Sequence, residues 1–184
     1  VPILDNRKRF EIVETRFVNT CIKVTKNLRY DTEEQENFPD YKKLFKTISV
    51  MNRKKKYTDS IDTSHDVVAY LMILMNYLSA KELIKLKCGV FRSAKFNETF
   101  VPPEGLPKGV KKFLKNWNSQ GGKYSKDVGD HDMLELDAYV HITSPIRRLV
   151  DLLNMITLQD KLGWKMSIKS KEFYERWTSD SSIE

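Results

Sequence analysis

A long apolar segment in the first half of the chain constrains the fold most strongly. Residues 67–75 read VVAYLMILM, inside a stretch that predicts a helix from Ser64, a good N-cap, to about Lys87. A helix that is apolar all round has to be covered on most sides, so we expect this one at the centre of a core. The apolar run is far shorter than the roughly 18 to 20 residues that cross a bilayer, and we therefore expect no membrane span. The charged N-terminus is unlike a signal sequence, and we expect neither secretion nor a membrane partner.

The composition is that of a globular chain able to build such a core. The 184 residues are 40% hydrophobic and 11% aromatic, which is neither a disordered nor a fibrous composition. Lys and Arg number 32 against 25 Asp and Glu, giving a net charge of +7. This charge favours a polyanionic partner, either nucleic acid or an acidic membrane, and it does not choose between them.

The cysteines indicate the cellular compartment of the chain, and its two ends suggest how it relates to a longer protein. Cys21 and Cys88 are far apart and lack the spacing of metal ligands, so neither a disulfide framework nor a zinc ribbon is indicated. We expect a reducing intracellular compartment, cytoplasm or nucleus, with a viral or organellar origin left open, and no disulfide-linked partner. The chain begins at Val1 without a methionine and ends in a polar stretch at Glu184, which suggests a piece of something longer.

Hydrophobic periodicity predicts an α/β (α+β) fold, with a mixed sheet flanked by long helices. Alternating β-branched and aromatic residues predict strands over residues 9–24, around Val90 and over Leu136–Val140, and residues 120–130 read as a flexible loop. Helical spacing predicts further helices over Asp40–Met51, 110–117, Ser144–Leu162 and Lys169–Trp177. The expected organisation is therefore a strand-rich part (8–30), a helical part (40–118), a strand and helix (131–162) and a terminal helix (169–178).

The segment His131–Asn154 carries the residues best suited to chemistry. Ser144 can cap a helix and Pro145 suits its first position, which would place Arg147 and Arg148 in the first turn. Two cations at the positive end of a helix dipole are poorly placed unless an anion binds there. With the Thr143 and Ser144 hydroxyls, they predict a phosphate clamp. The alternative is that Arg147 pairs with Asp151 or extends into solvent.

The same segment resembles a known family. The pattern Y-x-H-x-T-S-P-I-R-R-x-x-D, which runs from Tyr139 through His141 to Asp151, is similar to the signature of the ribonuclease II and ribonuclease R (RNB) family. His131 and Leu134 keep the family's preceding H-x-x-L spacing. Weaker similarities lie before this segment in the chain, at residues 21–30, 67–76 and 89–92, and they occur in the same order as in the family. The resemblance implies that residues 1–184 are the C-terminal two thirds of an RNB catalytic domain.

The resemblance also implies an activity and site residues. The family hydrolyses single-stranded RNA processively from 3′ to 5′ with magnesium, releasing nucleoside monophosphates. Tyr30 matches the tyrosine beside the scissile phosphate, although it could also be an ordinary half-buried tyrosine at a strand end. Arg147 matches the arginine that holds the terminal phosphate. Arg148 and Asp151 match positions that anchor the helix, and Arg148 could also contact RNA. Arg92 either faces the RNA or satisfies core carbonyls; His141 is assigned no catalytic role.

The sequence departs from the family where metal ions are bound. The family's aspartate cluster, D-x-x-x-x-x-D-x-D-D, has no counterpart, since the only acids before Tyr30 are Asp5, Glu11 and Glu14. Ala69 and Tyr70 stand where the family helix has its glutamates. Magnesium requires carboxylate ligands, so we assign none in this chain.

Two explanations stay open. In the first, the chain is a component of an exoribonuclease, and an upstream piece of the same protein supplies the metal-binding aspartates. In the second, it is a degenerate, inactive RNB fold kept as an RNA-binding or structural subunit. Retention of Tyr30 and Arg147 favours the first, and loss of the glutamates favours the second. Basic charge supports contact with single-stranded RNA under either explanation.

Overall fold

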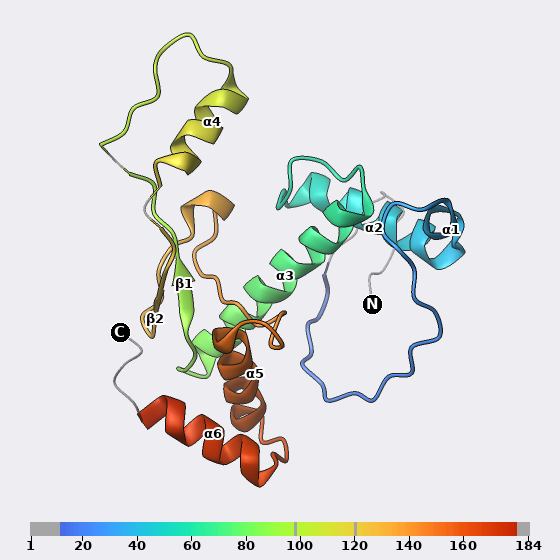
Figure 1. Cartoon of the computed structure of the whole chain (residues 1–184), viewed down its shortest axis with the longest axis vertical. Helices are drawn as coiled ribbons and strands as arrows, with labels where there is room; N and C mark the ends of the chain where they lie inside the picture. Colours follow the sequence, from blue (N-terminus) through green and yellow to red (C-terminus); the bar gives the residue numbers. More distant parts are fainter. Residues whose placement is uncertain (1–11, 98, 120, 180–184) are drawn as a thin grey trace. The chain divides into compact units, whose positions relative to one another are not determined.

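The computed structural model describes residues 12–97, 99–119 and 121–179. Contacts divide the chain into two units, Val1–Leu74 and Met75–Glu184, with one long helix running across the boundary. The described elements, labelled in Figure 1, are α1 (Glu33–Asn37), α2 (Pro39–Lys54), α3 (Ser64–Lys85), β1 (Phe91–Ser93), α4 (Lys108–Trp117), β2 (Lys123–Ser125), a 3-10 turn (Asp132–Leu134), α5 (Leu149–Lys161) and α6 (Ile168–Ser179).

The beginning of the first unit contradicts the sequence prediction of strands. Residues 12–29 form no strand, and most of their apolar side chains are exposed, with Ile22 80% and Val24 65% accessible. The strand-rich part predicted for 8–30 is therefore wrong over its described residues, and residues 8–11 lie outside them. An alternating pattern forms a strand only beside a partner that completes its hydrogen bonds and covers its apolar face. The described part of this unit supplies no such partner.

Helices form most of the remainder of the first unit. The predicted Asp40–Met51 helix is confirmed as α2, which begins with Pro39 in its first turn. The acidic residues before it form α1, which the sequence analysis missed. Its N-cap is Thr32, whose side chain accepts a hydrogen bond from the Gln35 N–H, and its glutamates complement the helix dipole. Tyr57 and Tyr70 pack in the core with their ring centroids 5.1 Å apart.

The apolar helix predicted from Ser64 is confirmed as α3. By length and composition alone, α3 is long and apolar enough to cross a membrane. Its residues Asn76 and Ser79 are polar and fully buried against the protein, which is typical of a core helix. The absence of a membrane span stays a prediction.

The second unit contains a small antiparallel sheet of β1 and β2, in which Arg92 lies opposite Tyr124. The strand predicted around Val90 is thus present as β1, whereas β2 lies in a stretch predicted to be a flexible loop. Leu136–Val140 does not form the predicted strand and makes only isolated bridges, such as Val140 with Phe91. Glu135, directly before this stretch, adopts a left-handed conformation (φ 53°), and just after it the Ile142 N–H donates to the Asn76 side chain of α3 instead of to a neighbouring strand.

Helices α4, α5 and α6 complete the second unit, and α4 confirms the helix predicted over residues 110–117. α6 confirms the predicted terminal helix, while α5 begins at Leu149, five positions later than the predicted start at Ser144. Leu153, Ile156 and Leu158 of α5 are buried with Val140 in the core of this unit. The predicted α+β class with long helices is confirmed, and its sheet, over the described residues, is limited to two short strands.

Candidate functional site

Two buried asparagines fix residues 139–142, the start of the signature segment. The Asn76 side-chain amide on α3 donates to the Tyr139 hydroxyl (2.9 Å) and accepts from the Ile142 N–H (3.1 Å). Asn154 on α5 donates to the carbonyls of Val90 (2.8 Å) and His141 (3.0 Å) and accepts from the Val90 N–H (2.7 Å). Both side chains are fully buried. Sequence reasoning missed both roles; the available signal was a polar amide within each of two apolar helices.

An ion pair anchors the following turn. Nε of Arg148 lies 2.7 Å from one carboxylate oxygen of Asp151, and a terminal nitrogen donates to the other oxygen at 2.8 Å. Asp151 is fully buried, and it also accepts a hydrogen bond from the Ser144 N–H (2.7 Å). Arg148 and Asp151 therefore have an anchoring geometry. The alternative pairing of Arg147 with Asp151 is wrong, because Arg148 occupies that carboxylate.

The phosphate clamp predicted at the N-terminus of a helix lies instead on a turn that precedes α5. Ser144 is not an N-cap: residues 144–147 form a turn, and α5 has Arg148 as its cap residue without a side-chain cap bond. The Asp151 carboxylate already occupies the backbone donor of Ser144, so this N–H is not available to an external anion. Arg147 and Thr143 are exposed on the turn, and Arg147 lies 3.5 Å from the Ser144 hydroxyl. The turn thus brings four predicted phosphate-binding residues together, with Arg147 facing solvent.

Arg92 is positioned by the strand pair. Its guanidinium lies over the Tyr124 ring, 5.4 Å from the centroid, and alongside Gly122, where a Cβ atom would overlap it. Its backbone N–H, and not its side chain, bonds a core carbonyl, that of Tyr139 (2.8 Å). The side chain is therefore held by an aromatic ring and a glycine in a partly exposed position.

His141 lies next to these cations. Its Nδ1 is 2.6 Å from the Tyr124 hydroxyl, and its ring packs edge-on against Tyr139. Burial and, to a smaller extent, the charges of Arg148 and Arg92 together lower the pKa of His141 to about 4. His141 is thus neutral near pH 7, and its Nδ1 can accept the Tyr124 proton. A base so weak is poorly matched to proton transfer at neutral pH, in agreement with assigning it no catalytic role.

Tyr30 belongs to the first unit and has different surroundings from those predicted. It lies in a turn rather than at a strand end, is half exposed, and stacks on His65 with ring centroids 4.4 Å apart. The neighbouring Asp31 carboxylate accepts hydrogen bonds from the Ser64 backbone N–H and hydroxyl, which hold its pKa below the ordinary value. Tyr30 therefore stands beside a local network that connects the start of α1 to the start of α3.

Magnesium does not fit the described residues. Among them, no group of three His, Cys, Asp or Glu side chains could hold a metal ion. Asp151 is committed to Arg148, and Glu14 pairs with Arg16 at 2.6 Å. Asp5 and Glu11 lie outside the described residues.

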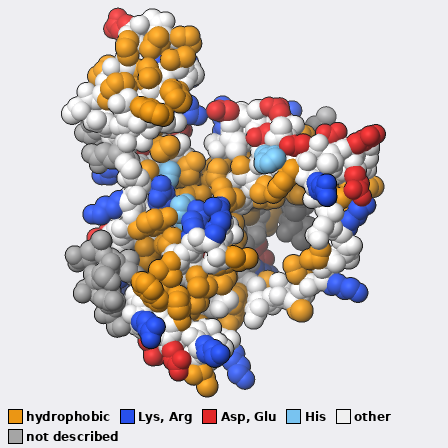
Figure 2. Space-filling view, in the orientation of Figure 1, with side chains coloured by type: hydrophobic (Ala, Val, Ile, Leu, Met, Phe, Trp, Pro, Cys, Tyr) orange, Lys and Arg blue, Asp and Glu red, His pale blue; other side chains and the backbone are white. Residues whose placement is uncertain are grey.

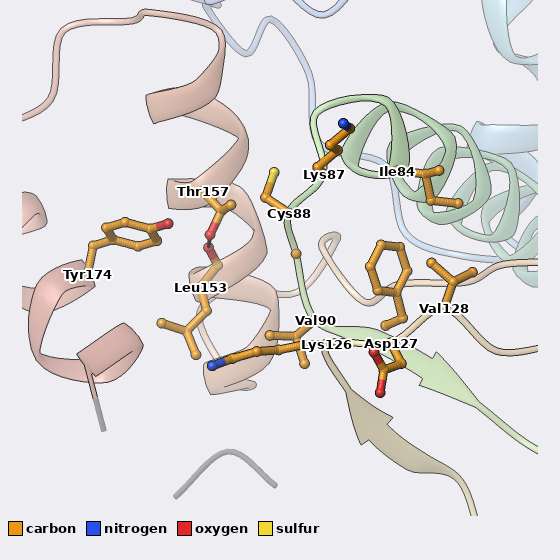
Figure 3. Close-up of a pocket in the computed structure, with 12 residues that line it drawn as sticks. Ile84, Lys87, Cys88, Val90, Lys126, Asp127, Val128, Leu153, Thr157 and Tyr174 are labelled. Atoms are coloured by element: carbon orange, nitrogen blue, oxygen red, sulfur yellow. Dashed lines mark hydrogen bonds between the residues drawn. The ribbon is translucent and has the colours of Figure 1, made fainter. Parts of the chain in front are cut away.

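A separate cavity of about 500 Å³ lies in the second unit (Figure 3). Apolar side chains of α3, β1 and α5 form much of its wall, and Tyr174 of α6 lies at one side. Cys88 also lines it, and burial raises the pKa of that thiol. None of the predicted site residues lines this cavity.

A comparison with known families matches residues 92–163 to the RNB domain. The chain carries an RNB-type segment. This segment contains Arg92 and the entire turn with Thr143, Ser144, Arg147 and Arg148, so the cationic site lies wholly within it. The predicted resemblance to the RNB family is confirmed, while Tyr30 and α3 lie outside the matched residues.

A solved structure supports the RNB fold. The chain is similar to an active-site mutant of the Dss1 exoribonuclease from Candida glabrata, with a TM-score of 0.52 and 17% identity. The similarity covers 73% of this chain and 22% of that one, so the chain spans less than a quarter of the length of the exoribonuclease. At this identity the similarity concerns the fold. No curated protein matches the sequence.

Proposed function

We propose that the chain is a component of an RNB-type 3′-to-5′ exoribonuclease acting on single-stranded RNA, with the metal-binding aspartates on an upstream piece. The observation that carries this proposal is the cationic site in the RNB-type segment, where Arg148 pairs with the buried Asp151 and holds a turn on which Arg147 is exposed. An intracellular, reducing location is part of the same proposal.

The arginines have separate tasks in the proposed site. Arg148 holds the turn through Asp151, and Arg147 extends from that turn into solvent, where its guanidinium can bind the two oxygens of an RNA phosphate. Arg92 adds a second cation, held in place by Tyr124. The fixed backbone at His141, bonded by Asn154, keeps the turn in register with β1. Tyr30 is proposed to act beside the scissile phosphate only on the family resemblance.

Hydrolysis of the family type uses magnesium, which stabilises the attacking and leaving oxygens. The described residues do not supply its ligands, so no catalytic step is assigned to them. A second candidate function follows from Tyr70, which occupies a glutamate position of the family helix and is 1% exposed in the core. A buried packing residue at that place favours an inactive RNB fold that binds RNA without cutting it.

One assay separates the two candidates. The purified chain is incubated with end-labelled single-stranded RNA and magnesium, alone and together with the upstream piece of the same protein. For the exoribonuclease component, we expect mononucleotide release only with both pieces and its loss in Arg147→Ala. Arg53→Ala, which removes an exposed arginine of α2, is the control and should retain activity.

The other outcomes are equally informative. RNA binding that weakens steeply with salt, with no degradation in the presence of both pieces, would contradict the exoribonuclease component and support the inactive fold. Absence of RNA binding both by the chain alone and with the upstream piece added would contradict both candidates.

A further inference from the structure

Helix α4 has two chemically opposite faces. At 100° per residue, its apolar side chains fall on one side and its lysines on the other, each set at the spacing i, i+3, i+4, i+7. The apolar face consists of Val110, Phe113, Leu114 and Trp117, and the basic face of Lys108, Lys111, Lys112 and Lys115. A helix with this separation needs an apolar environment on one side and a polar environment on the other.

The apolar face of α4 lies open. No residue of α4 is buried in the described structure, and Phe113 and Trp117 are 59% and 77% exposed with ring centroids 5.9 Å apart. Figure 2 shows hydrophobic side chains exposed over the lobe that contains α4. α6 has the same pair at the same spacing, Phe173 and Trp177, but there both side chains are partly buried. The same pair of aromatic side chains is thus exposed on α4 and partly covered on α6.

All charged side chains of α4 itself are lysines. Residues 105–126 include six lysines and no aspartate or glutamate. A groove on a partner protein would bind the apolar face and leave the lysines in water. The positive charges of the lysines would then contact no anionic group. A single RNA strand binds best where aromatic rings and cations share one face, whereas here they lie on opposite faces. The arrangement fits an environment in which an apolar interior is bordered by a layer of anionic groups.

We propose that α4 binds the surface of an anionic phospholipid membrane. Phe113, Trp117 and their apolar neighbours enter the boundary of the acyl chains, and the lysine stems extend to the phosphate headgroups. A helix of ten residues is about 15 Å long and lies in the interface without crossing the bilayer. This peripheral contact departs from the sequence-based expectation of no membrane partner, although the net charge had left an acidic membrane open.

Vesicle binding by the full chain tests this proposal. The protein is sedimented with vesicles of phosphatidylcholine mixed with phosphatidylserine, and in parallel with vesicles of phosphatidylcholine alone. We expect binding to the anionic vesicles that weakens with added salt, with a blue shift in tryptophan fluorescence. Binding to neither type, or equal binding to both, would overturn the proposal.

Matched variants assign the binding to α4. Phe113→Ala with Trp117→Ala should abolish the blue shift and most binding, whereas Phe173→Ala with Trp177→Ala in α6 should retain both. Lys111→Gln with Lys115→Gln should lower vesicle partitioning roughly 25-fold at low salt, because each lysine near an anionic surface contributes about 1 kcal/mol. Circular dichroism checks that each variant is folded.

Two results would refute the assignment to α4. The first is unchanged vesicle binding by the Phe113 and Trp117 double variant. The second is no vesicle binding by the wild type together with loss of affinity for single-stranded RNA in the α4 variants, which would make this helix an RNA-binding surface instead.

Discussion

At the scale of single residues, Asn154 joins three parts of the second unit: its own helix, the beginning of β1 and His141. Its amide satisfies both backbone groups of Val90 and one carbonyl of the signature segment, all within a buried region. A side chain with one donor group and one acceptor group at the same end is required for this contact, because Val90 presents both an N–H and a C=O.

Asn154→Ala should therefore destabilise the chain strongly. The substitution leaves buried donors and acceptors unsatisfied, and we expect the free energy of unfolding to fall by about 3 kcal/mol. Urea denaturation followed by circular dichroism measures the change. Asn118→Ala is the control, because Asn118 makes a local bond to Leu114 at the end of α4, and it should cost less than about 1 kcal/mol. Equal losses in the two variants would contradict the role assigned to Asn154.

His141 gives the chain a predictable sensitivity to acid. Its pKa is about 4 in the folded state and close to the ordinary 6.5 in the unfolded state. Between these values the unfolded chain binds more protons, so stability falls as the pH decreases from 6.5 to 4. In His141→Gln this part of the pH dependence should disappear. Urea denaturation across the range tests it, and identical pH profiles for the two proteins would refute it.

At the scale of elements, the pairing of β1 with β2 places Arg92 in the site. Tyr124 lies opposite Arg92 in the register, and Gly122 lies directly before β2 where the guanidinium needs space. Pairing of the two strands thus places the Tyr124 ring of β2 beside the Arg92 guanidinium of β1 and holds that guanidinium in position.

Gly122→Ala should disturb binding without disturbing the fold. The added Cβ overlaps the end of the Arg92 side chain, which is flexible and can move, so we expect the stability to change by less than about 0.5 kcal/mol. Affinity for single-stranded RNA should fall as it does in Arg92→Ala. Gly121→Ala is the matched control, since a Cβ there meets no atom within 4 Å. Fluorescence anisotropy with labelled RNA measures the affinity, and an unchanged affinity in both Gly122→Ala and Arg92→Ala would exclude Arg92 from the binding site.

Elements with a strong local pattern could be predicted from the sequence, and elements that depend on distant partners could not. α2, α3, α4 and α6 follow from helical spacing, with ends shifted by a few residues. The strands predicted for residues 12–24 are absent, because alternation by itself supplies no partner strand. The early start predicted for α5 failed because Asp151, seven positions after Ser144, accepts the Ser144 N–H, and residues 144–147 form a turn before the helix.

At the scale of the whole molecule, the described residues provide positive charge for binding a polyanion but no carboxylate cluster for binding magnesium. The chain carries a net charge of +7 and a cationic site in its RNB-type segment, which suits it to a polyanion. Its described residues contain no cluster of metal ligands.

Magnesium alone should consequently leave the chain unchanged. A ligand that binds the folded state raises the melting temperature, so we expect no rise when magnesium replaces EDTA. Differential scanning fluorimetry measures this directly. Addition of the upstream piece should make the melting temperature of the mixture dependent on magnesium. A rise with the chain alone would show that it holds a metal site of its own, contrary to the proposed division between two pieces.

The sequence by itself determined the apolar central helix, the basic charge and the RNB resemblance, because each is written in neighbouring residues or in a sum over all of them. Only the tertiary structure decided which arginine pairs with Asp151, that Asn76 and Asn154 hold the signature segment, and that α4 leaves its aromatic face exposed. These features depend on contacts between residues far apart in the chain or on the absence of cover, and no local pattern specifies either.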